Sequence, residues 1–134
     1  MEEFEEPDYT AVSANDETSD GLNALNLKWV LGFNKDIYNG VHNLSSQERT
    51  EIFYTAAHTG VIYNYSTKEQ KLLQGHCNKI SCCATSVDKK FIVTADSGTD
   101  SMLVIWDSHS ATPVKTIFTP HPTGVSQLDI SQDA

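Results

Sequence analysis

The stretch LLQGHCNKISCCATSVDKKFIVTADSGTDSMLVIWD, residues 72–107, decides the fold. It contains short apolar, β-branched runs separated by pieces rich in Gly, Asp, Ser and Lys. Such runs, bounded by turn residues, are typical of antiparallel strands. Together with the alternating run just beyond it, the stretch predicts four strands near 80–85, 91–95, 102–106 and 114–118. No segment shows a sustained helical period, so we expect little helix.

Two dipeptides in this stretch, Gly75-His76 and Trp106-Asp107, give it a family resemblance. Repeats of roughly 40–45 residues with a G-H…W-D signature are typical of WD-repeat β-propellers, which this chain resembles. The resemblance implies an all-β fold with a full blade over about 75–118. A propeller needs roughly 4–8 blades, more than 134 residues can supply. We therefore expect an incomplete propeller, and interpret the chain as a fragment, a truncated gene model or a short isoform.

The resemblance also implies a buried hydrogen-bonded set in the full blade. In WD repeats a His, a Ser or Thr, an Asp and the Trp bond one another, because these polar groups are costly to bury without partners. We assign the four positions to His76, Thr94, Asp100 and Trp106. We expect this set to hold the blade together rather than to perform chemistry.

A partial copy of the blade precedes it. Residues 52–56 align with residues 91–95, and Tyr63-Asn64 stands where the Trp-Asp dipeptide would be. This copy therefore lacks the hydrogen-bonded set. We predict a degenerate blade over about 37–73, with its first strand within residues 37–44.

A second partial copy follows the blade. His121 and residues 125–131 repeat His76 and residues 80–86 at a shift of forty-five. The repeat predicts the first strand of a next blade over residues 121–134.

The charge of the chain is concentrated at its beginning. Residues 1–20 hold eight acidic and no basic residues, so they carry −8 of the net −9 and leave −1 for the rest. Few of them are apolar, so we predict an acidic, disordered tail over residues 1–24. We expect this tail to be solvated, with a basic partner or a tubulin-associated protein as the functional alternative. The near-zero balance of the remainder argues against nucleic-acid binding.

Sequence patterns for catalysis, metal binding and membrane insertion are missing. No secretory signal occurs, and no apolar run approaches the roughly 18–20 residues that span a bilayer, so we expect a soluble, intracellular protein. There is no phosphate-binding Gly-Lys loop, His-Glu-x-x-His or Gly-x-Ser-x-Gly pattern. The acidic stretch 96–107 lacks the glycine of a calcium loop. We expect no enzyme activity, cofactor, metal or small-molecule substrate, and buried apolar roles for Cys77, Cys82 and Cys83.

Several strings are more specific than the general repeat. They are Leu25–Trp29, Ala57–Asn64, Leu73–Cys82, Thr94–Asp100, Ile105–Ser108 and Thr116–Phe118. Together they resemble the ciliary WD-repeat proteins of the calmodulin- and spoke-associated complex.

This narrower resemblance implies a non-catalytic structural scaffold of the motile axoneme. Its expected partners are other axonemal proteins at the base of the radial spoke, and its expected location is the cytoplasm, the cytoskeleton and the axoneme of the cilium or flagellum. The calcium-binding region of that family has no counterpart in these residues, so the resemblance does not extend a calcium-sensing role to this chain and calcium dependence stays open. The alternatives are a generic intracellular WD-repeat scaffold or adaptor in another complex and, from a different class, an enzyme built on a propeller.

Overall fold

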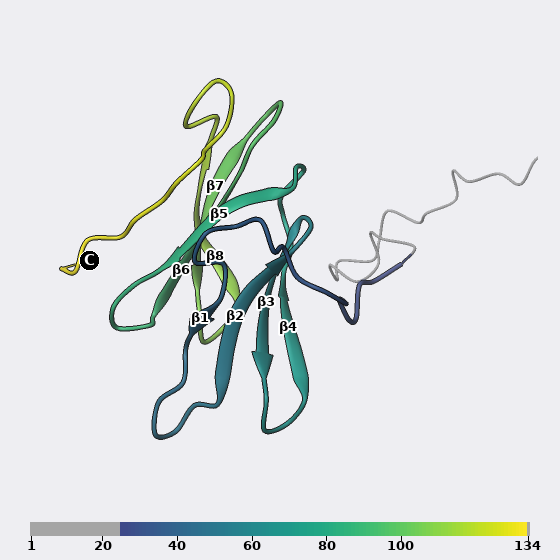
Figure 1. The fold of residues 1–134 in the computed structure, drawn as a ribbon, viewed down its shortest axis with the longest axis vertical. Helices are drawn as coiled ribbons and strands as arrows, with labels where there is room; N and C mark the ends of the chain where they lie inside the picture. Colours follow the sequence, from purple (N-terminus) through teal and green to yellow (C-terminus); the bar gives the residue numbers. More distant parts are fainter. Residues whose placement is uncertain (1–24, 134) are drawn as a thin grey trace, which may run out of the picture.

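The structure, a computed structural model, describes residues 25–133, which form two antiparallel sheets of four strands each (Figure 1). The first sheet contains, in order, β1 (His42–Asn43), β2 (Glu51–Ala56), β3 (Thr59–Asn64) and β4 (Glu69–Leu73). The second contains β5 (Ile80–Thr85), β6 (Phe91–Asp96), β7 (Met102–Asp107) and β8 (Thr112–Phe118). Consecutive strands are neighbours throughout, so each sheet is a simple meander. The acidic tail predicted over residues 1–24 lies outside the described residues.

The all-β fold expected from the sequence is confirmed. The strands predicted at 80–85, 91–95 and 102–106 form within one residue of those bounds, while the fourth begins at Thr112 instead of residue 114. Within the described residues no helix is present that could cross a membrane.

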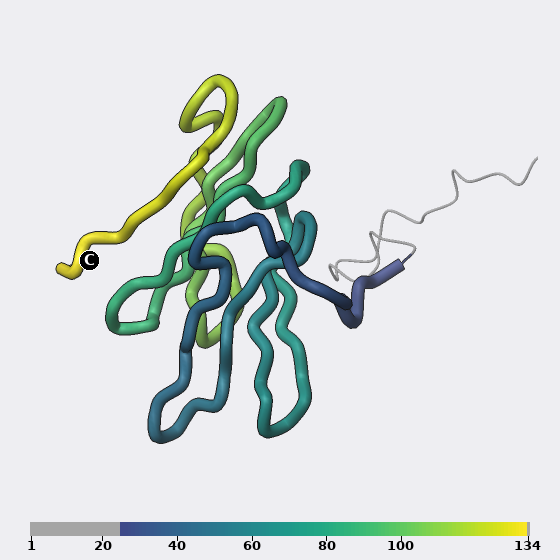
Figure 2. The backbone as a smooth tube through the Cα atoms, in the orientation of Figure 1, coloured from purple at the N-terminus to yellow at the C-terminus, as the bar shows by residue number. Residues whose placement is uncertain are grey.

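The hydrophobic core lies between the two sheets, which run beside each other in Figure 2. Its main side chains are Phe53, Ile62 and Leu73 from the first sheet and Ile92, Val104 and Trp106 from the second. All six are nearly inaccessible to solvent. Burying a large apolar side chain stabilises a fold by roughly 1.5–3 kcal/mol, so this shared core holds the two sheets together.

The strand registers correct the predicted alignment of the two blades by one residue. Ile52 pairs with Tyr63 across β2 and β3, and Ile92 pairs with Trp106 across β6 and β7. Because Tyr63 takes the place of Trp106, Ile52 corresponds to Ile92 rather than to Phe91. A slip of one residue turns every side chain of a strand to the opposite face, so this difference decides which residues of the first blade take the positions of the hydrogen-bonded set.

The strand predicted over residues 121–134 does not form in residues 121–133. The segment nevertheless repeats the path that leads into β5. The Val125 N–H donates to the Asp96 carbonyl at 3.2 Å, as the Ile80 N–H donates to the Ala57 carbonyl at 3.0 Å. A strand requires a neighbouring ladder for its backbone groups, and the described residues offer none here.

Gly124 is essential to the docking of this segment. Its φ is +114°, and a Cβ there would lie 2.4 Å from the Ser97 Cα. We expect Gly124→Ala to release the segment, so that the Val125 amide loses its protection in hydrogen exchange. Gly32→Ala is the matched control, because Gly32 has a φ of +80° but open space around it. Retained protection of Val125 in the Gly124 variant would show that the segment is held elsewhere.

An extended segment, residues 25–34, lies against the first sheet on the side away from the second, and we call it the N-terminal strap. Its centre is fixed by a pair of hydrogen bonds: the Val30 N–H donates to Gln70 Oε1 at 2.9 Å, and Gln70 Nε2 donates to the Val30 carbonyl at 3.0 Å. The Trp29 ring meets Tyr63 edge to face at 6.3 Å. In Figure 1 the strap is the dark segment that leads toward β1.

Candidate functional site

Three of the four residues assigned to the hydrogen-bonded set come together in the second blade. Thr94 Oγ1 lies 2.7 Å from His76 Nε2, and Trp106 Nε1 donates to the same oxygen at 2.8 Å. His76 precedes β5, whereas Thr94 and Trp106 lie on the neighbouring strands β6 and β7. All three are buried.

The acidic member of the set is Asp96, not Asp100. His76 Nδ1 lies 3.0 Å from Asp96 Oδ2, and the Met102 N–H donates to Asp96 Oδ1 at 2.8 Å. Asp96 is fully buried. Asp100 is exposed in the turn between β6 and β7, where its φ is +56°. Residues two apart on a strand share a face, so Asp96 faces the same way as Thr94, whereas the exposed side chain of Asp100 is not among the partners of the set in the described residues.

The geometry defines the direction of the hydrogen bonds. A carboxylate only accepts, so His76 Nδ1 carries the proton that is shared with Asp96. His76 Nε2 then accepts from the Thr94 hydroxyl, whose oxygen accepts the indole N–H of Trp106. Burial lowers the pKa of His76 below its usual 6.5, against the opposing effect of the Asp96 hydrogen bond and charge. The imidazole is therefore held neutral, as a structural link between three strands.

This protonation state predicts a pH dependence of stability. Burial also lowers the pKa of His42. Both histidines bind a proton near pH 6.5 in the unfolded chain, but only at lower pH in the folded chain. Acidification therefore favours the unfolded chain, and the free energy of unfolding falls as the pH drops below about 6.5. We expect the urea midpoint to decrease steadily between about pH 7.5 and 5.5, with less dependence in His76→Gln. A midpoint that is flat or rises on acidification would contradict the neutral assignment.

The first blade keeps the fold without the set. In the corrected register, Tyr54, Ala56 and Tyr63 occupy the positions of the Thr, the Asp and the Trp. The Tyr54 hydroxyl instead accepts from Gln70 Nε2 at 3.2 Å. Gln70 is also the residue that binds the strap, so the strap and the blade are joined through one amide.

The last residue of the Trp-Asp signature acts in a turn. Asp107 Oδ1 accepts from the His109 and Ser110 N–H groups, both at 2.9 Å. Asn64, at the equivalent position of the first blade, accepts from the Ser66 and Thr67 N–H groups at 3.0 and 3.1 Å. The hairpin turn is thus preserved in the degenerate blade.

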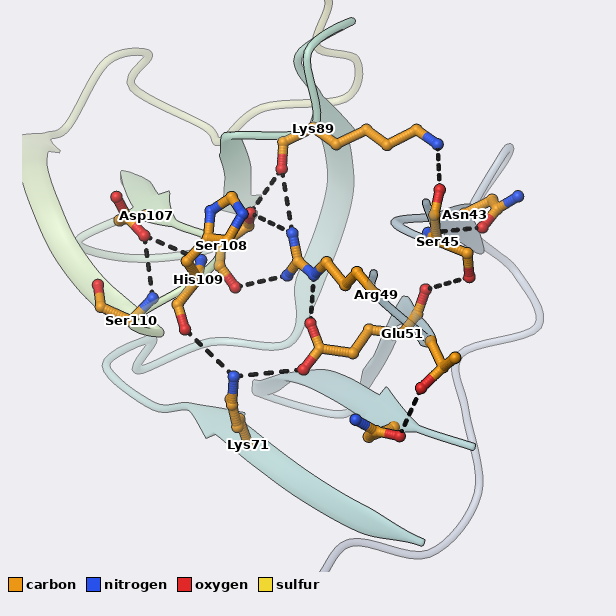
Figure 3. A network of polar contacts seen from close by, with 12 residues as sticks. Asn43, Ser45, Arg49, Glu51, Lys71, Lys89, Asp107, Ser108, His109 and Ser110 are labelled. Carbon is orange, nitrogen blue, oxygen red and sulfur yellow. Dashed lines mark hydrogen bonds and ion pairs between the residues drawn. The ribbon is translucent and has the colours of Figure 1, made fainter. Parts of the chain in front are cut away.

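A polar network joins the two blades at one end of the shared core (Figure 3). Its centre is Arg49, in the turn between β1 and β2. Arg49 Nη2 donates to the Ser108 carbonyl at 2.7 Å and Nη1 donates to Ser108 Oγ at 2.9 Å, while Nη1 also reaches the Lys89 carbonyl at 3.4 Å. Arg49 Nε pairs with the carboxylate of Glu51. One guanidinium therefore links the first blade to two turns of the second.

Two lysines extend this network. Lys71 Nζ lies 3.2 Å from Glu51 Oε1 and donates to the His109 carbonyl at 3.1 Å. Lys89 Nζ donates from the second blade to the Ser45 carbonyl of the first at 2.6 Å. Burial raises the pKa of Glu51, but the hydrogen bonds and charges of Arg49 and Lys71 outweigh burial, and the pKa lies below its usual 4.5. Glu51 is thus ionised and buried between its two partners.

The cysteines are free, and two of the three are buried as expected. Cys82 and Cys83 are buried, and burial raises the pKa of the Cys83 thiol to about 12. Cys77 is exposed, which differs from the expectation. Across residues 25–133 no three His, Cys, Asp or Glu side chains are grouped so that they could hold a metal ion.

Two four-stranded meanders packed face to face, one with a Trp-Thr-His-Asp set, define the class: they are blades of a WD-repeat β-propeller. The fold is similar to the β-propeller domain of Cps50 (Swd1) from Myceliophteria thermophila, with a TM-score of 0.51 and 15% identity over 77% of this chain and 30% of that one. The family model described as the CFAP251 N-terminal domain matches residues 25–134. The chain belongs to this family.

Relatives of the chain are named as cilia- and flagella-associated proteins. The cilia- and flagella-associated protein 251 of Tetrahymena thermophila is 53% identical over 130 residues, which are 97% of this chain and 13% of that protein. Its counterpart in Chlamydomonas reinhardtii is 42% identical over 110 residues, 82% of this chain and 14% of that protein. The chain thus spans about one seventh of the length of these relatives.

Proposed function

We propose that this chain is part of a non-catalytic structural scaffold of the motile ciliary or flagellar axoneme. It binds other axonemal proteins at the base of the radial spoke and so supports motility of the cilium. The observation that carries the proposal is the family match over residues 25–134, whose relatives are named as cilia- and flagella-associated proteins.

The structure supports a role in binding rather than in catalysis. The buried side chains of the hydrogen-bonded set, His76, Thr94, Asp96 and Trp106, bond one another and hold strands together. The turns carry exposed apolar side chains, among them Tyr38, at 85% exposure, and Val87, at 68%. A rigid β-framework with side chains displayed on its turns is suited to protein–protein contact. No nucleic acid, membrane or small molecule is proposed as a partner.

Deletion and rescue in a ciliated cell tests this proposal. We expect cells without the gene to assemble cilia that beat weakly, and the wild-type protein to restore beating. Asp100→Asn, which changes an exposed turn residue, should restore beating as well, whereas Asp96→Ala, which breaks the buried set, should not. Normal beating after deletion would reject the axonemal role in favour of a generic intracellular WD-repeat scaffold.

A further inference from the structure

A groove of about 510 Å³ lies beside the first half of β4, in the first blade. Its lining comes from the strap, from β2, β3 and β4, and from the turn that joins β3 to β4. The lining residues that matter for its chemistry are three lysines, two acids and one aromatic residue: Lys28, Lys68, Lys71, Glu51, Glu69 and Trp29.

The buried carboxylate of this groove is already neutralised. Glu51 pairs with Arg49 as well as with Lys71, whose Nζ lies 3.2 Å from Glu51 Oε1 (Figure 3). Lys71 therefore shares its acid with a second cation, and its side chain is 46% exposed. The three side chains together leave one positive charge at the groove, which is open to a further anion.

Two other lysines add their charges to this one. Lys28 comes from the strap and Lys68 from the turn before β4, and both are exposed. In the part of the chain that the structure describes, neither forms an ion pair. Among the lining residues only the carboxylate of Glu69 remains to oppose the lysines. The groove is therefore electropositive in a domain whose residues 21–134 carry only −1 in total, and it favours a ligand with several carboxylates.

Trp29 gives the groove an aromatic wall beside these charges. Its ring meets Tyr63 edge to face at 6.3 Å, which fixes its position, and 47% of the residue stays exposed. Aromatic rings pair favourably with one another. The groove is thus suited to a peptide in which an aromatic residue stands among carboxylates.

The beginning of this chain has that composition. Residues 2–9, EEFEEPDY, hold five of the eight acidic residues of the first twenty, and Phe4 stands between two pairs of glutamates. Residues 10–24 connect this segment to the strap, and fifteen residues can span up to about 50 Å. The length is ample for a return to the groove. A ligand attached in this way acts at an effective concentration on the order of millimolar, so that weak charge pairing suffices.

We propose that residues 2–9 of this chain dock in the groove between the strap and β4. The glutamates on either side of Phe4 pair with the three lysines, and the Phe4 ring covers Trp29. The basic partner of the acidic tail is then the first blade of the same chain. The inference rests on the groove and on the composition of the tail, so it stands apart from the ciliary role.

Acrylamide quenching of tryptophan fluorescence in the whole 134-residue chain tests the inference. Trp106 is 3% exposed, so the quenching reports on Trp29. The comparison is with a variant in which glutamates 2, 3, 5 and 6 are replaced by glutamine. At an ionic strength of about 0.01 M we expect the quenching constant of the wild-type chain to be about threefold lower than that of this variant. At about 1 M salt, where charges are screened within roughly 3 Å, the two constants should agree.

Two pairs of lysine substitutions make the test specific. Lys28→Gln combined with Lys68→Gln should raise the quenching constant to that of the glutamine-tail variant. Lys79→Gln combined with Lys115→Gln is the matched control, because it removes the same charge from exposed positions outside the groove. This control should keep the low constant of the wild-type chain.

The inference is overturned if the wild-type chain and the glutamine-tail variant are quenched equally at low salt, or if the protection survives the loss of Lys28 and Lys68. Protection that grows with chain concentration would also overturn it, because a second copy would then supply the acidic segment. If Trp29 is unprotected in the wild-type chain but is protected by a free EEFEEPDY peptide, the groove belongs to an acidic partner and docking within the chain is refuted.

Discussion

Asp96→Ala is expected to destabilise the domain by about 3 kcal/mol or more. The change leaves the imidazole of His76 and the backbone N–H of Met102 without their acceptor in a buried site. Each unsatisfied buried group costs roughly 1–3 kcal/mol. Because Asp96 links two neighbouring strands to His76, we expect the loss to appear as one cooperative decrease of the urea midpoint.

The matched control is Asp100→Asn, which keeps a residue type that tolerates the positive φ of this turn. The Asp100 side chain is exposed, so we expect a change within about 0.5 kcal/mol. Equal losses in the two variants would show that the turn, rather than the hydrogen-bonded set, dominates stability.

Arg49→Met should be comparably disruptive, with an expected loss of about 3 kcal/mol, because the buried carboxylate of Glu51 is left with one of its two cations and its charge is only partly compensated. Glu51 is only 6% exposed and would keep Lys71 as its single cation. The Ser108 carbonyl would lose its guanidinium donor as well. Chemical denaturation measures the loss, and Met retains most of the apolar stem of the side chain.

Two further variants separate charge from geometry. Lys115→Met removes a cation from an exposed position of β8 and should change stability by less than about 0.5 kcal/mol. Arg49→Met combined with Glu51→Leu should recover part of the loss, since neither charge is then buried alone. An Arg49→Met variant as stable as Lys115→Met would mean that the core alone joins the blades.

The strands of the full blade could be predicted because their signals are local. Short β-branched runs between Asp, Gly and Lys turns mark their own limits, and the structure places β5, β6 and β7 within a residue of the prediction. The register of the degenerate blade could not be fixed in this way. Residues 52–56 are apolar on both faces, so alternation could not distinguish Phe91 from Ile92 as the partner of Ile52.

The acidic residue of the set was misassigned for a related reason. Asp96 and Asp100 flank the same turn, and distance from the Trp does not say which one is buried. Strand alternation did carry the signal, because Asp96 is two residues beyond Thr94 and must share its face. Had the predicted strand 91–95 been extended by one residue, it would have included Asp96 and placed this carboxylate on the face of Thr94.

The contacts between the blades have no signal in the repeat pattern. Arg49 lies in a turn that the repeat does not specify, and two of its four acceptors are backbone carbonyls. The strap likewise carries no repeat signal, and its residues 25–29 contribute only to the family resemblance.

Location in the cell tests the central claim most directly. The measurement is the position of the tagged full-length protein in a motile ciliated cell after detergent extraction. The proposed scaffold role predicts a signal that persists along the axoneme when the membrane and soluble proteins are removed. A signal that is diffuse in the cytosol or nucleus, or is lost on extraction, would contradict it.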